Sequence, residues 1–349
     1  MKIFENQLYL SDLDETIQNV IHMDKLQNSR ILITGVTGTI GSYLVDTLVR
    51  YNNKFQAGIK IYAAGRNIEK MQQRFGTDNN SEIIFLSYDM MKPIGFDNGV
   101  DYIIHAAGNA HPAAFNGDPV GTIMGNVQGT YQLLSYAKKQ GAKRFLYVSS
   151  GEVYGQGDVA LDSFSEDYVG VLDINSPRSC YPMSKRTTEN LCSSYYSQFG
   201  LETVMVRPCH TYGPYMTESD SRANVQFMKN ALASQNIVLK SAGTQMRSYC
   251  YVADCASAIL TVLLNGEAGE SYNIANSTAR TTIAGLAETI AKVSGTNVIF
   301  EDPTATDIAN RTPIAKQVLN SQKLESLGWK GHFSVDEGIE HTYLILKSL

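Results

Sequence analysis

The sequence has few charged residues for its length and no run of lysine or arginine. Charged residues make up 18% of the 349 residues, and the formal net charge is −5. A chain with this balance has no bulk electrostatic attraction to nucleic acid or to anionic lipid. We therefore expect no nucleic-acid partner and no membrane partner.

Long apolar stretches and a secretory leader are also absent from the sequence. No window approaches the roughly 20 apolar residues that a membrane-spanning helix needs. Glu5 interrupts the start of the chain before an apolar leader segment develops. These absences predict a cytoplasmic location.

Cysteine usage argues against a disulfide framework and against a thiolate metal site. The sequence holds five cysteines, an odd number, and no two of them form a C-x-x-C pair. No cluster of histidine, cysteine and carboxylate residues has metal-ligand spacing. We expect free, buried thiols and no bound metal. The cysteines are Cys180, Cys192, Cys209, Cys250 and Cys255.

What the sequence does contain is a regular alternation of short apolar runs and longer helical stretches. This alternation predicts βαβ units and a parallel sheet that is buried on both faces. The fold class is therefore α/β, a Rossmann doubly wound parallel sheet with a smaller C-terminal α/β substrate lobe. The expected strands lie at 31–33, 59–63, 83–86, 102–105, 145–148 and 203–206, and the clearest helices at 40–51, 120–139 and 183–199.

The alternation of apolar runs and helical stretches divides the chain into three expected parts. Residues 1–29 precede the first strand as a helical extension, and residues 30–208 form the dinucleotide-binding domain. After Pro208 the alternation loosens, so residues 209–349 are expected to form mainly the substrate lobe. A segment near 247–276 is expected to return to the first domain and to add a strand at 272–275. No linker separates the two parts, which places the site in the cleft between them.

The N-terminal extension has apolar residues at helical spacing, among them Leu13, Ile17 and Val20. Ser11 and Asp14 resemble a capping box, which predicts a helix that begins near residue 11. This helix packs either on the body of the protein or on a partner subunit.

A glycine-rich turn follows the first expected strand in the segment ILITGVTGTIG. Gly35 allows the tight turn, Gly38 lets backbone N–H groups approach a pyrophosphate, and Gly41 allows close packing of the helix. The strand–turn–helix context makes dinucleotide binding the favoured interpretation. The spacing G-x-x-G-x-x-G is the form seen in short-chain dehydrogenases/reductases.

The choice between NAD and NADP is left open by the end of the second strand. The segment YAAGRN has no carboxylate for the ribose hydroxyls of NAD. Arg66 either pairs with the 2′-phosphate of NADP, stacks on adenine, or is an ordinary solvated arginine.

Tyr181 and Lys185 stand four residues apart in an expected helix and so share one face. An ammonium close to a phenol lowers the phenol pKa, and the phenolate can then take the proton of a sugar hydroxyl. Ser150 ends the fifth expected strand, where side chains of a parallel sheet face the ligand crevice. Ser150 is therefore placed to hold the reacting hydroxyl.

Taken together, the glycine-rich turn, the strand-end serine and the Tyr/Lys pair resemble the extended short-chain dehydrogenases/reductases that act on nucleotide-sugars, namely epimerases, dehydratases and decarboxylases. The resemblance runs from about Arg30 to Tyr343. It includes IIHAAGNAHP, NVQGTYQLL, SSGEVYG, YPMSK, VRPCHTYGP, MRSYCYVAD and SYNIAN. The stretches SPRSCYPMSKRTTE, DSRANVQFMKNAL and TQMRSYCYVAD look closest to UDP-glucuronate decarboxylases.

This resemblance implies roles for individual residues. Catalytic residues would be Ser150, Tyr181, Lys185 and Glu152, although Glu152 is otherwise read as a charged loop residue. Substrate contacts would come from His111, Ser150, Arg222, Asn224 and Arg247; for Arg247 the alternative is a surface ion pair with Asp254, and for His111 a structural role. Cofactor contacts would come from Gly35, Thr37, Gly38, Thr39, Ile40, Gly41, Arg66, Asp89, Met90, Ala106, Ala107, Gly108, Asn126, Tyr181, Lys185 and Pro208.

Two positions depart from the family patterns. Gly151 stands where 4,6-dehydratases carry an aspartate and where decarboxylases carry a small hydroxyl residue. Ser184 stands where decarboxylases tend to have glycine.

Three functions are compatible with the sequence. The first is oxidation of a nucleotide-sugar hydroxyl, at C4, followed by epimerisation, dehydration or decarboxylation with NAD or NADP. The second is an NADPH-dependent reductase or dehydrogenase of a nucleotide-linked sugar or polyol, and the third is a non-catalytic dinucleotide-binding protein. The resemblance also implies a homodimer, formed by helices near 120–139 and 183–199.

Overall fold

A computed structural model describes residues 3–76, 82–108, 110, 112–217, 220–304 and 314–349. Its centre is a seven-stranded parallel sheet in the order β10-β6-β5-β4-β1-β2-β3. All six apolar runs are strands of this sheet, as the alternation predicted. The strands are β1 Arg30–Thr34, β2 Lys60–Gly65, β3 Ile83–Ser87, β4 Tyr102–His105, β5 Arg144–Val148, β6 Thr203–Pro208 and β10 Ser271–Ile274.

The strands are apolar throughout because successive side chains enter two different cores. Ile31, Ile33 and Leu146 belong to the core on one face, whereas Leu32 and Phe145 belong to the core on the other face. The period of two therefore buries both sets, as expected for a sheet covered on both sides.

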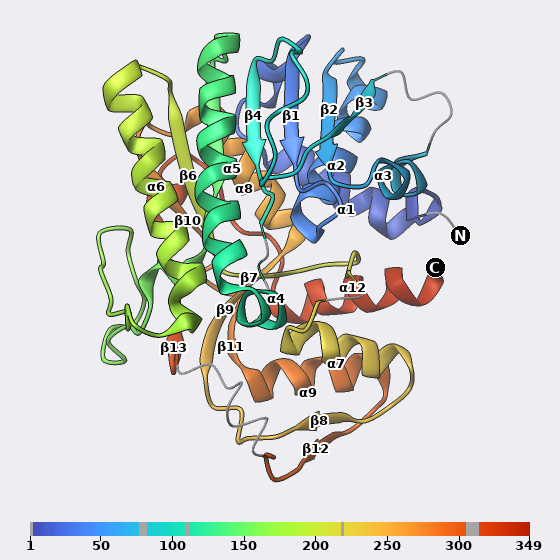
Figure 1. Cartoon of the computed structure of the whole chain (residues 1–349). Helices are drawn as coiled ribbons and strands as arrows, with labels where there is room; N and C mark the ends of the chain where they lie inside the picture. Colours follow the sequence, from blue (N-terminus) through green and yellow to red (C-terminus); the bar gives the residue numbers. More distant parts are fainter. Residues whose placement is uncertain (1–2, 77–81, 109, 111, 218–219, 305–313) are drawn as a thin grey trace.

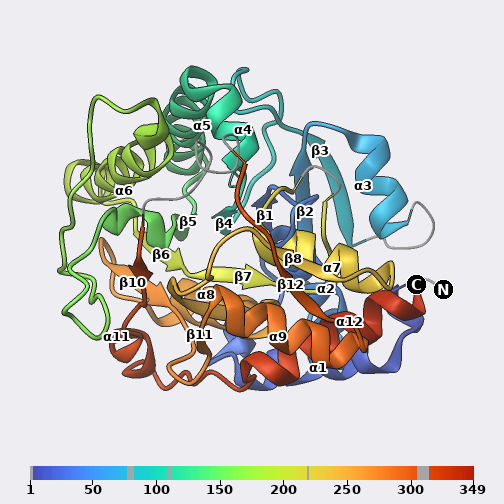
Figure 2. The ribbon, with the colours of Figure 1, turned by 90° about the horizontal axis from the view of Figure 1, so that it is seen from below.

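Helices cover both faces of the sheet (Figures 1 and 2). α5 and α6 pack side by side on one face, and α2, α8 and α1 pack together on the other. The helices of this part are α1 Gln7–Asn19, α2 Thr39–Phe55, α3 Ile68–Phe75, α4 Pro112–Gly117, α5 Pro119–Gln140, α6 Cys180–Phe199 and α8 Val252–Asn265, with 3-10 turns η1 Ile3–Glu5, η2 Met23–Leu26, η3 Gly151–Tyr154 and η4 Pro177–Ser179.

A smaller part of the fold lies beyond the carboxyl ends of the strands (Figure 1). It holds a mixed sheet, in which β9 pairs with β7, β11 and β13, and the separate parallel pair β8 and β12. Its elements are β7 His210–Tyr212, α7 Ala223–Leu232, β8 Ile237–Leu239, β9 Met246–Tyr251, β11 Arg280–Thr282, α9 Ile283–Ser294, β12 Val298–Phe300, β13 Lys316–Gln317, α11 Gln322–Glu325 and α12 Val335–Ser348.

The returning segment is shorter than its expected range 247–276. Only β10 joins the main sheet, where Tyr272 pairs with Val206 of β6. β9 instead pairs with strands of the smaller part, and α8 between them packs on α1 and α2. The chain therefore passes from the smaller part to the main sheet after β9, and not at residue 247.

The N-terminal helix packs on the body of its own chain. α1 begins at Gln7, and Asn6 caps it by accepting a hydrogen bond from the Tyr9 N–H at 2.9 Å. The capping box expected at Ser11 and Asp14 is wrong, because Asp14 bonds the Arg50 guanidinium at 2.9 Å.

Polar contacts tie α1 to the far end of the chain. Buried Asp12 accepts hydrogen bonds from the Tyr251 hydroxyl at 2.5 Å and bonds His341 Nδ1 of α12 at 2.8 Å. The two chain ends consequently lie beside each other in Figures 1 and 2. None of the described helices is long and apolar enough to cross a membrane.

Candidate active site

The glycine-rich turn between β1 and α2 leaves no room for side chains at two of its glycines. Gly35 has φ +73°, and a Cβ there would lie 2.7 Å from the backbone of Ala106. A Cβ on Gly41 would lie 2.3 Å from the Gly35 carbonyl oxygen. Gly38 is the N-cap of α2 and bears no capping side chain, so the first N–H groups of the helix face outward for an anion.

A cavity opens over this turn, which we call the glycine-loop cavity. Gly65 and Arg66 at the end of β2 and Asp89 after β3 form its other walls, and Arg66 is exposed. A dinucleotide fits this donor set, because backbone N–H groups face the phosphates and an arginine and a carboxylate flank the adenosine end. The expected cofactor residues that line it are Gly35, Thr37, Gly38, Thr39, Ile40, Gly41, Arg66, Asp89, Met90, Ala106, Ala107 and Gly108.

Asn126 is an expected cofactor residue that lies behind this cavity. Its side chain is 2% exposed and donates a hydrogen bond to the Ser184 hydroxyl at 2.9 Å. A Cβ on Gly108 would meet its amide oxygen at 3.3 Å. Asn126 therefore supports the wall at Gly108 and does not line the cavity, which the sequence did not distinguish.

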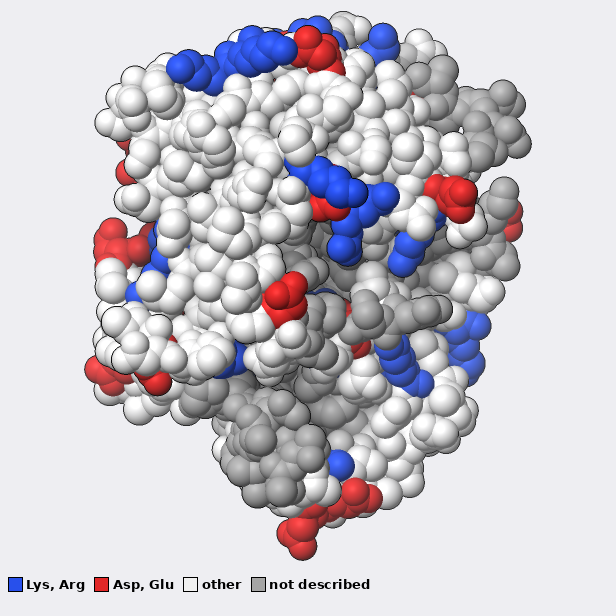
Figure 3. Space-filling model, in the orientation of Figure 1, with Lys and Arg blue, Asp and Glu red and all other residues white. Residues whose placement is uncertain are grey.

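A second cavity of about 260 Å³, the Tyr181 cavity, holds the expected chemistry. Tyr181, Lys185, Ser150 and Glu152 line it together with Pro208. Ile40, Ala106, Gly108, Ala110, Thr211 and Arg222 line both cavities, so the two spaces are neighbours. Figure 3 shows a hollow near the middle of this face, with basic and acidic side chains at its border.

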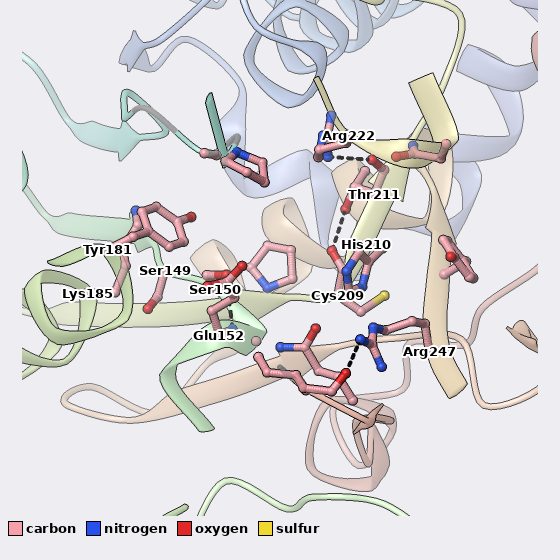
Figure 4. Close-up of a pocket in the computed structure, with 18 of the residues that line it drawn as sticks. Ser149, Ser150, Glu152, Tyr181, Lys185, Cys209, His210, Thr211, Arg222 and Arg247 are labelled. Carbon is pink, nitrogen blue, oxygen red and sulfur yellow. Dashed lines mark hydrogen bonds between the residues drawn. The ribbon is translucent and has the colours of Figure 1, made fainter. Parts of the chain in front are cut away.

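Tyr181 and Ser150 lie on the same side of the Tyr181 cavity, together with Lys185 (Figure 4). Ser150 is the N-cap of η3, and its hydroxyl accepts a hydrogen bond from the Glu152 N–H at 3.1 Å. Burial raises the pKa of Tyr181, and the Glu152 carboxylate acts in the same direction. A hydrogen bond to Ser150 and the nearby Arg222 and Arg178 act against this rise in the Tyr181 pKa.

Lys185 was expected to lower the pKa of Tyr181, whereas the groups that do so here are Ser150, Arg222 and Arg178. The Lys185 ammonium donates to the Val148 carbonyl oxygen at 2.8 Å and lies 5.7 Å from the centre of the Tyr181 ring. Burial lowers the pKa of Lys185 to about 7, against the pull of Glu189. A half-protonated amine is a weak source of positive charge for Tyr181.

A residue that the sequence reasoning missed is Arg178, in η4. Its guanidinium bonds both oxygens of Glu152, at 3.1 and 3.2 Å. It also lies 4.4 Å from the centre of the Phe115 ring, which stacks on Tyr181 at 5.1 Å. Glu152 is thus held by a bidentate pair and is not a free loop carboxylate. Arg178 stands three residues before Tyr181, but no spacing rule pairs it with Glu152, which lies 26 residues away in the chain.

The opposite wall comes from the smaller part of the fold (Figure 4). Arg222 bonds Asp220 at 2.6 Å and the Thr211 carbonyl oxygen at 3.1 Å, and Asn224 stands in the first turn of α7. His210 is a further residue that the sequence missed: its Nδ1 is buried with no hydrogen-bond partner among the described residues. Burial and two arginines, Arg247 and Arg222, lower the pKa of His210 to about 3, so this ring is neutral.

Arg247 lines the cavity but is not the surface residue that the alternative interpretation assumed. It is 3% exposed and donates to the carbonyl oxygens of Met246 at 2.9 Å and Ala315 at 3.1 Å. Asp254 bonds the N–H groups of His332 and Phe333 instead. His111, the remaining expected substrate residue, lies outside the described residues.

The described residues offer no metal site: no group of three or more histidine, cysteine or carboxylate side chains is arranged to hold an ion. All five cysteines are buried and free.

Comparison with known proteins agrees with this geometry. The model of the NAD dependent epimerase/dehydratase family matches residues 31–275. UDP-glucuronic acid decarboxylase 6 of Arabidopsis thaliana is 33% identical over 89% of the chain and 87% of its own length. UDP-glucuronic acid decarboxylase 1 of Xenopus tropicalis is 30% identical over 95% of the chain and 78% of its own length.

Among solved structures, the dTDP-glucose 4,6-dehydratase of Streptomyces venezuelae, crystallised with NAD, is similar with a TM-score of 0.76 and 25% identity. The match covers 91% of the chain and 97% of the dehydratase. The chain belongs to the NAD dependent epimerase/dehydratase family of enzymes.

Proposed function

We propose that this enzyme oxidises the C4 hydroxyl of a nucleotide-diphosphate hexuronate, releases the C6 carboxylate as CO2 and then reduces the C4 ketone. The observation that carries the proposal is the meeting of Tyr181, Ser150 and Lys185 in a cavity that adjoins the glycine-loop cavity. Residues 30–208 would bind mainly NAD and residues 209–349 mainly the nucleotide-sugar.

Each residue of the Tyr181 cavity has its own role in the proposed oxidation. Ser150 holds the C4 hydroxyl, and Tyr181 accepts its proton. NAD supplies the acceptor for the hydride that leaves C4 and later returns it. Arg178 and Arg222 favour the phenolate of Tyr181, against the burial that raises its pKa. Lys185 lines the same cavity and donates a hydrogen bond to the Val148 carbonyl oxygen.

Loss of CO2 follows from the ketone. With a ketone at C4, the C6 carboxylate is attached to the carbon next to the carbonyl, so the electron pair of the breaking C5–C6 bond moves into an enolate. A proton from solvent then adds to C5, and Tyr181 would give its proton back to the C4 oxygen as the ketone is reduced by bound NADH. The sequence of steps needs no outside oxidant, because the hydride that is removed is returned.

Two observations favour a hexuronate as the substrate. The Tyr181 cavity is lined by three arginines, Arg178, Arg222 and Arg247, against a single carboxylate among its described lining residues, Glu152. The curated relatives reported above are UDP-glucuronic acid decarboxylases over most of this chain. Gly151 brings no acid for the elimination that a 4,6-dehydratase performs.

The test is incubation of the purified enzyme and NAD with UDP-glucuronate, UDP-glucose and dTDP-glucose. The proposal expects release of one CO2 per UDP-glucuronate and a UDP-pentose product by mass spectrometry, with no net NADH. Turnover of a neutral hexose in place of the uronate would refute the substrate assignment. Stabilisation by NAD without turnover of any nucleotide-sugar would refute catalysis and favour a dinucleotide-binding protein.

One observation favours a second function, an NADPH-dependent reductase of a nucleotide-linked sugar or polyol. The end of β2 provides Gly65 and the exposed Arg66 where NAD enzymes of this fold place a carboxylate. Purification separates the two functions: retained NAD supports internal hydride return, whereas an empty site with a preference for NADPH supports net reduction.

We also propose a homodimer through α5 and α6. Their outer faces expose Met124 and Tyr131 of α5 and Tyr196 and Phe199 of α6, each at least 40% exposed. Light scattering tests this, and a monomer at micromolar concentration would contradict it. Tyr131→Glu is expected to produce the monomer.

A further inference from the structure

The space beside Gly151 is occupied by side chains from a different part of the fold. A Cβ on Gly151 would lie 3.1 Å from Leu319 Cδ1 and 3.6 Å from Gln317 Nε2. Gly151 stands between Ser150 and Glu152, both of which line the Tyr181 cavity. Position 151 has no side chain, and the amide group of Gln317 therefore lies beside it in the same cavity wall.

Gln317 reaches this wall from β13. It pairs in register with Arg247 of β9, and its side chain is 4% exposed while lining the Tyr181 cavity. Its amide nitrogen is buried and has no hydrogen-bond partner among the described residues. A buried donor without a partner is costly, and a ligand oxygen at this place would remove the cost.

The two arginines nearest to this wall already have partners. Both terminal nitrogens of Arg178 donate hydrogen bonds to the Glu152 carboxylate. Arg247 donates to the carbonyl oxygens of Met246, Ala315 and Ile314. Among the described residues that line the cavity, Ser149 Oγ, His210 Nδ1 and Gln317 Nε2 are buried without a partner, and Gln317 Nε2 is the one that lies beside Gly151.

We propose that Gln317 is a specificity-determining residue, whose amide N–H donates to the C6 carboxylate of the nucleotide-linked hexuronate. The inference rests on the proposed function, and it adds the residue that recognises the carboxylate. Ser150 would hold the C4 oxygen, and Gln317 Nε2 lies beside Gly151, the residue that follows Ser150, so it would be near the substituent of the neighbouring C5.

The chemistry of an amide suits this place. An amide has no ionisable proton near neutral pH, so it binds the carboxylate without supplying an acid to an adjacent oxygen. An aspartate at position 151 would repel the same carboxylate and would offer a proton for elimination of water. The pair Gly151 and Gln317 therefore favours a uronate over a neutral hexose.

The test uses NAD-loaded protein in a Tyr181→Phe background, where turnover is blocked and binding is at equilibrium. Calorimetry compares UDP-glucuronate, UDP-glucose and UDP for Gln317, Gln317→Met and Gln317→Glu. Gln317→Met removes the donor at similar length, and Gln317→Glu adds a like charge. Gln18→Glu, on the exposed face of α1, is the matched control for the charge change.

We expect UDP-glucuronate to bind about tenfold more weakly with Gln317→Met and at least about a hundredfold more weakly with Gln317→Glu. UDP-glucose and UDP should change by less than about threefold, and the control by less than about twofold. Equal loss for UDP-glucuronate and UDP-glucose, or no loss for either, would overturn the role of Gln317. Since Gln317→Glu buries a charge, the thermal unfolding of each variant is measured as well. If Gln317→Glu does not fold, the binding data for Gln317→Met decide the role of Gln317.

The parent protein separates this inference from the proposed function. If the enzyme with Tyr181 intact releases no CO2 from UDP-glucuronate, and its Tyr181→Phe variant does not bind that compound, both fall together. If the parent enzyme releases CO2, and the Gln317 variants prefer UDP-glucuronate to UDP-glucose as strongly as the protein with Gln317 does, only the assignment of Gln317 is refuted.

Discussion

Replacing Lys185 by methionine should make the cofactor-free protein more stable at low pH. Lys185 is 4% exposed, and burial lowers the pKa of its amine from 10.5 to about 7. Below pH 7 the folded protein therefore keeps a buried ammonium, at a cost of at most roughly 5 kcal/mol relative to the unfolded chain. Methionine has a similar length and no charge, so Lys185→Met removes this cost.

The pH dependence follows from the two protonation states. Between pH 7 and 10.5 the unfolded chain holds the proton on Lys185 and the folded protein does not, so the free energy of unfolding of the parent rises with pH across this window. The advantage of Lys185→Met should therefore shrink by about 2 to 3 kcal/mol between pH 6 and pH 9.

Urea unfolding of the parent and the variant at these two pH values measures the difference, since the other titrating groups are common to both. Lys60→Met, at an exposed position, is the control and should show no such change. The reasoning is refuted if the parent and Lys185→Met differ by the same amount at pH 6 and pH 9. The variant should also lose turnover, which would show that the buried amine is retained for catalysis at the expense of stability.

Three further changes test the site. Tyr181→Phe should lower turnover by about 10²- to 10⁴-fold with NAD affinity unchanged by calorimetry, and full activity would contradict its role in proton transfer. Gly41→Ala should weaken NAD binding at least about tenfold because its Cβ would lie 2.3 Å from the Gly35 carbonyl, whereas Gly95→Ala, with open space around it, should bind normally. Arg178→Met should lower kcat about tenfold or more, since Glu152 loses its bidentate partner; an unchanged kcat, as expected for Arg280→Met at an exposed ion pair, would argue against this.

The sequence predicted the main sheet because parallel strands buried on both faces leave an unmistakable pattern. Each apolar run became a strand, since neither Leu32 nor Ile33 meets water. The smaller part was harder to predict because its strands are two to six residues long and pair across long gaps, as β7 with β9. Segments this short carry too few residues to show a period.

For the site, the sequence identified groups whose chemistry is local and missed those defined by distant contacts. Ser150, Tyr181 and Lys185 were found because each stands at a strand end or on a helix face. The partner of Glu152 was not found, because an ion pair across 26 residues of chain leaves no spacing rule. Lys185 was expected to act on the phenol, but the sequence gives no measure of burial, and burial controls both pKa values.

The contact between the two ends of the chain has a consequence for biosynthesis. α1 is made before α8 and α12, and Asp12 acquires its partners Tyr251 and His341 only when the chain has been translated as far as residue 341. Before α8 and α12 are made, Asp12 lacks these partners and α1 is covered by α2 but not by those two helices, so part of its apolar stripe is exposed to aggregation. Deleting α12 should therefore leave Asp12 without its His341 partner while α1 stays packed on α2 and α8. A bulky fusion at either end would lie against the other end, where Asn6 bonds Ser348 at 2.8 Å.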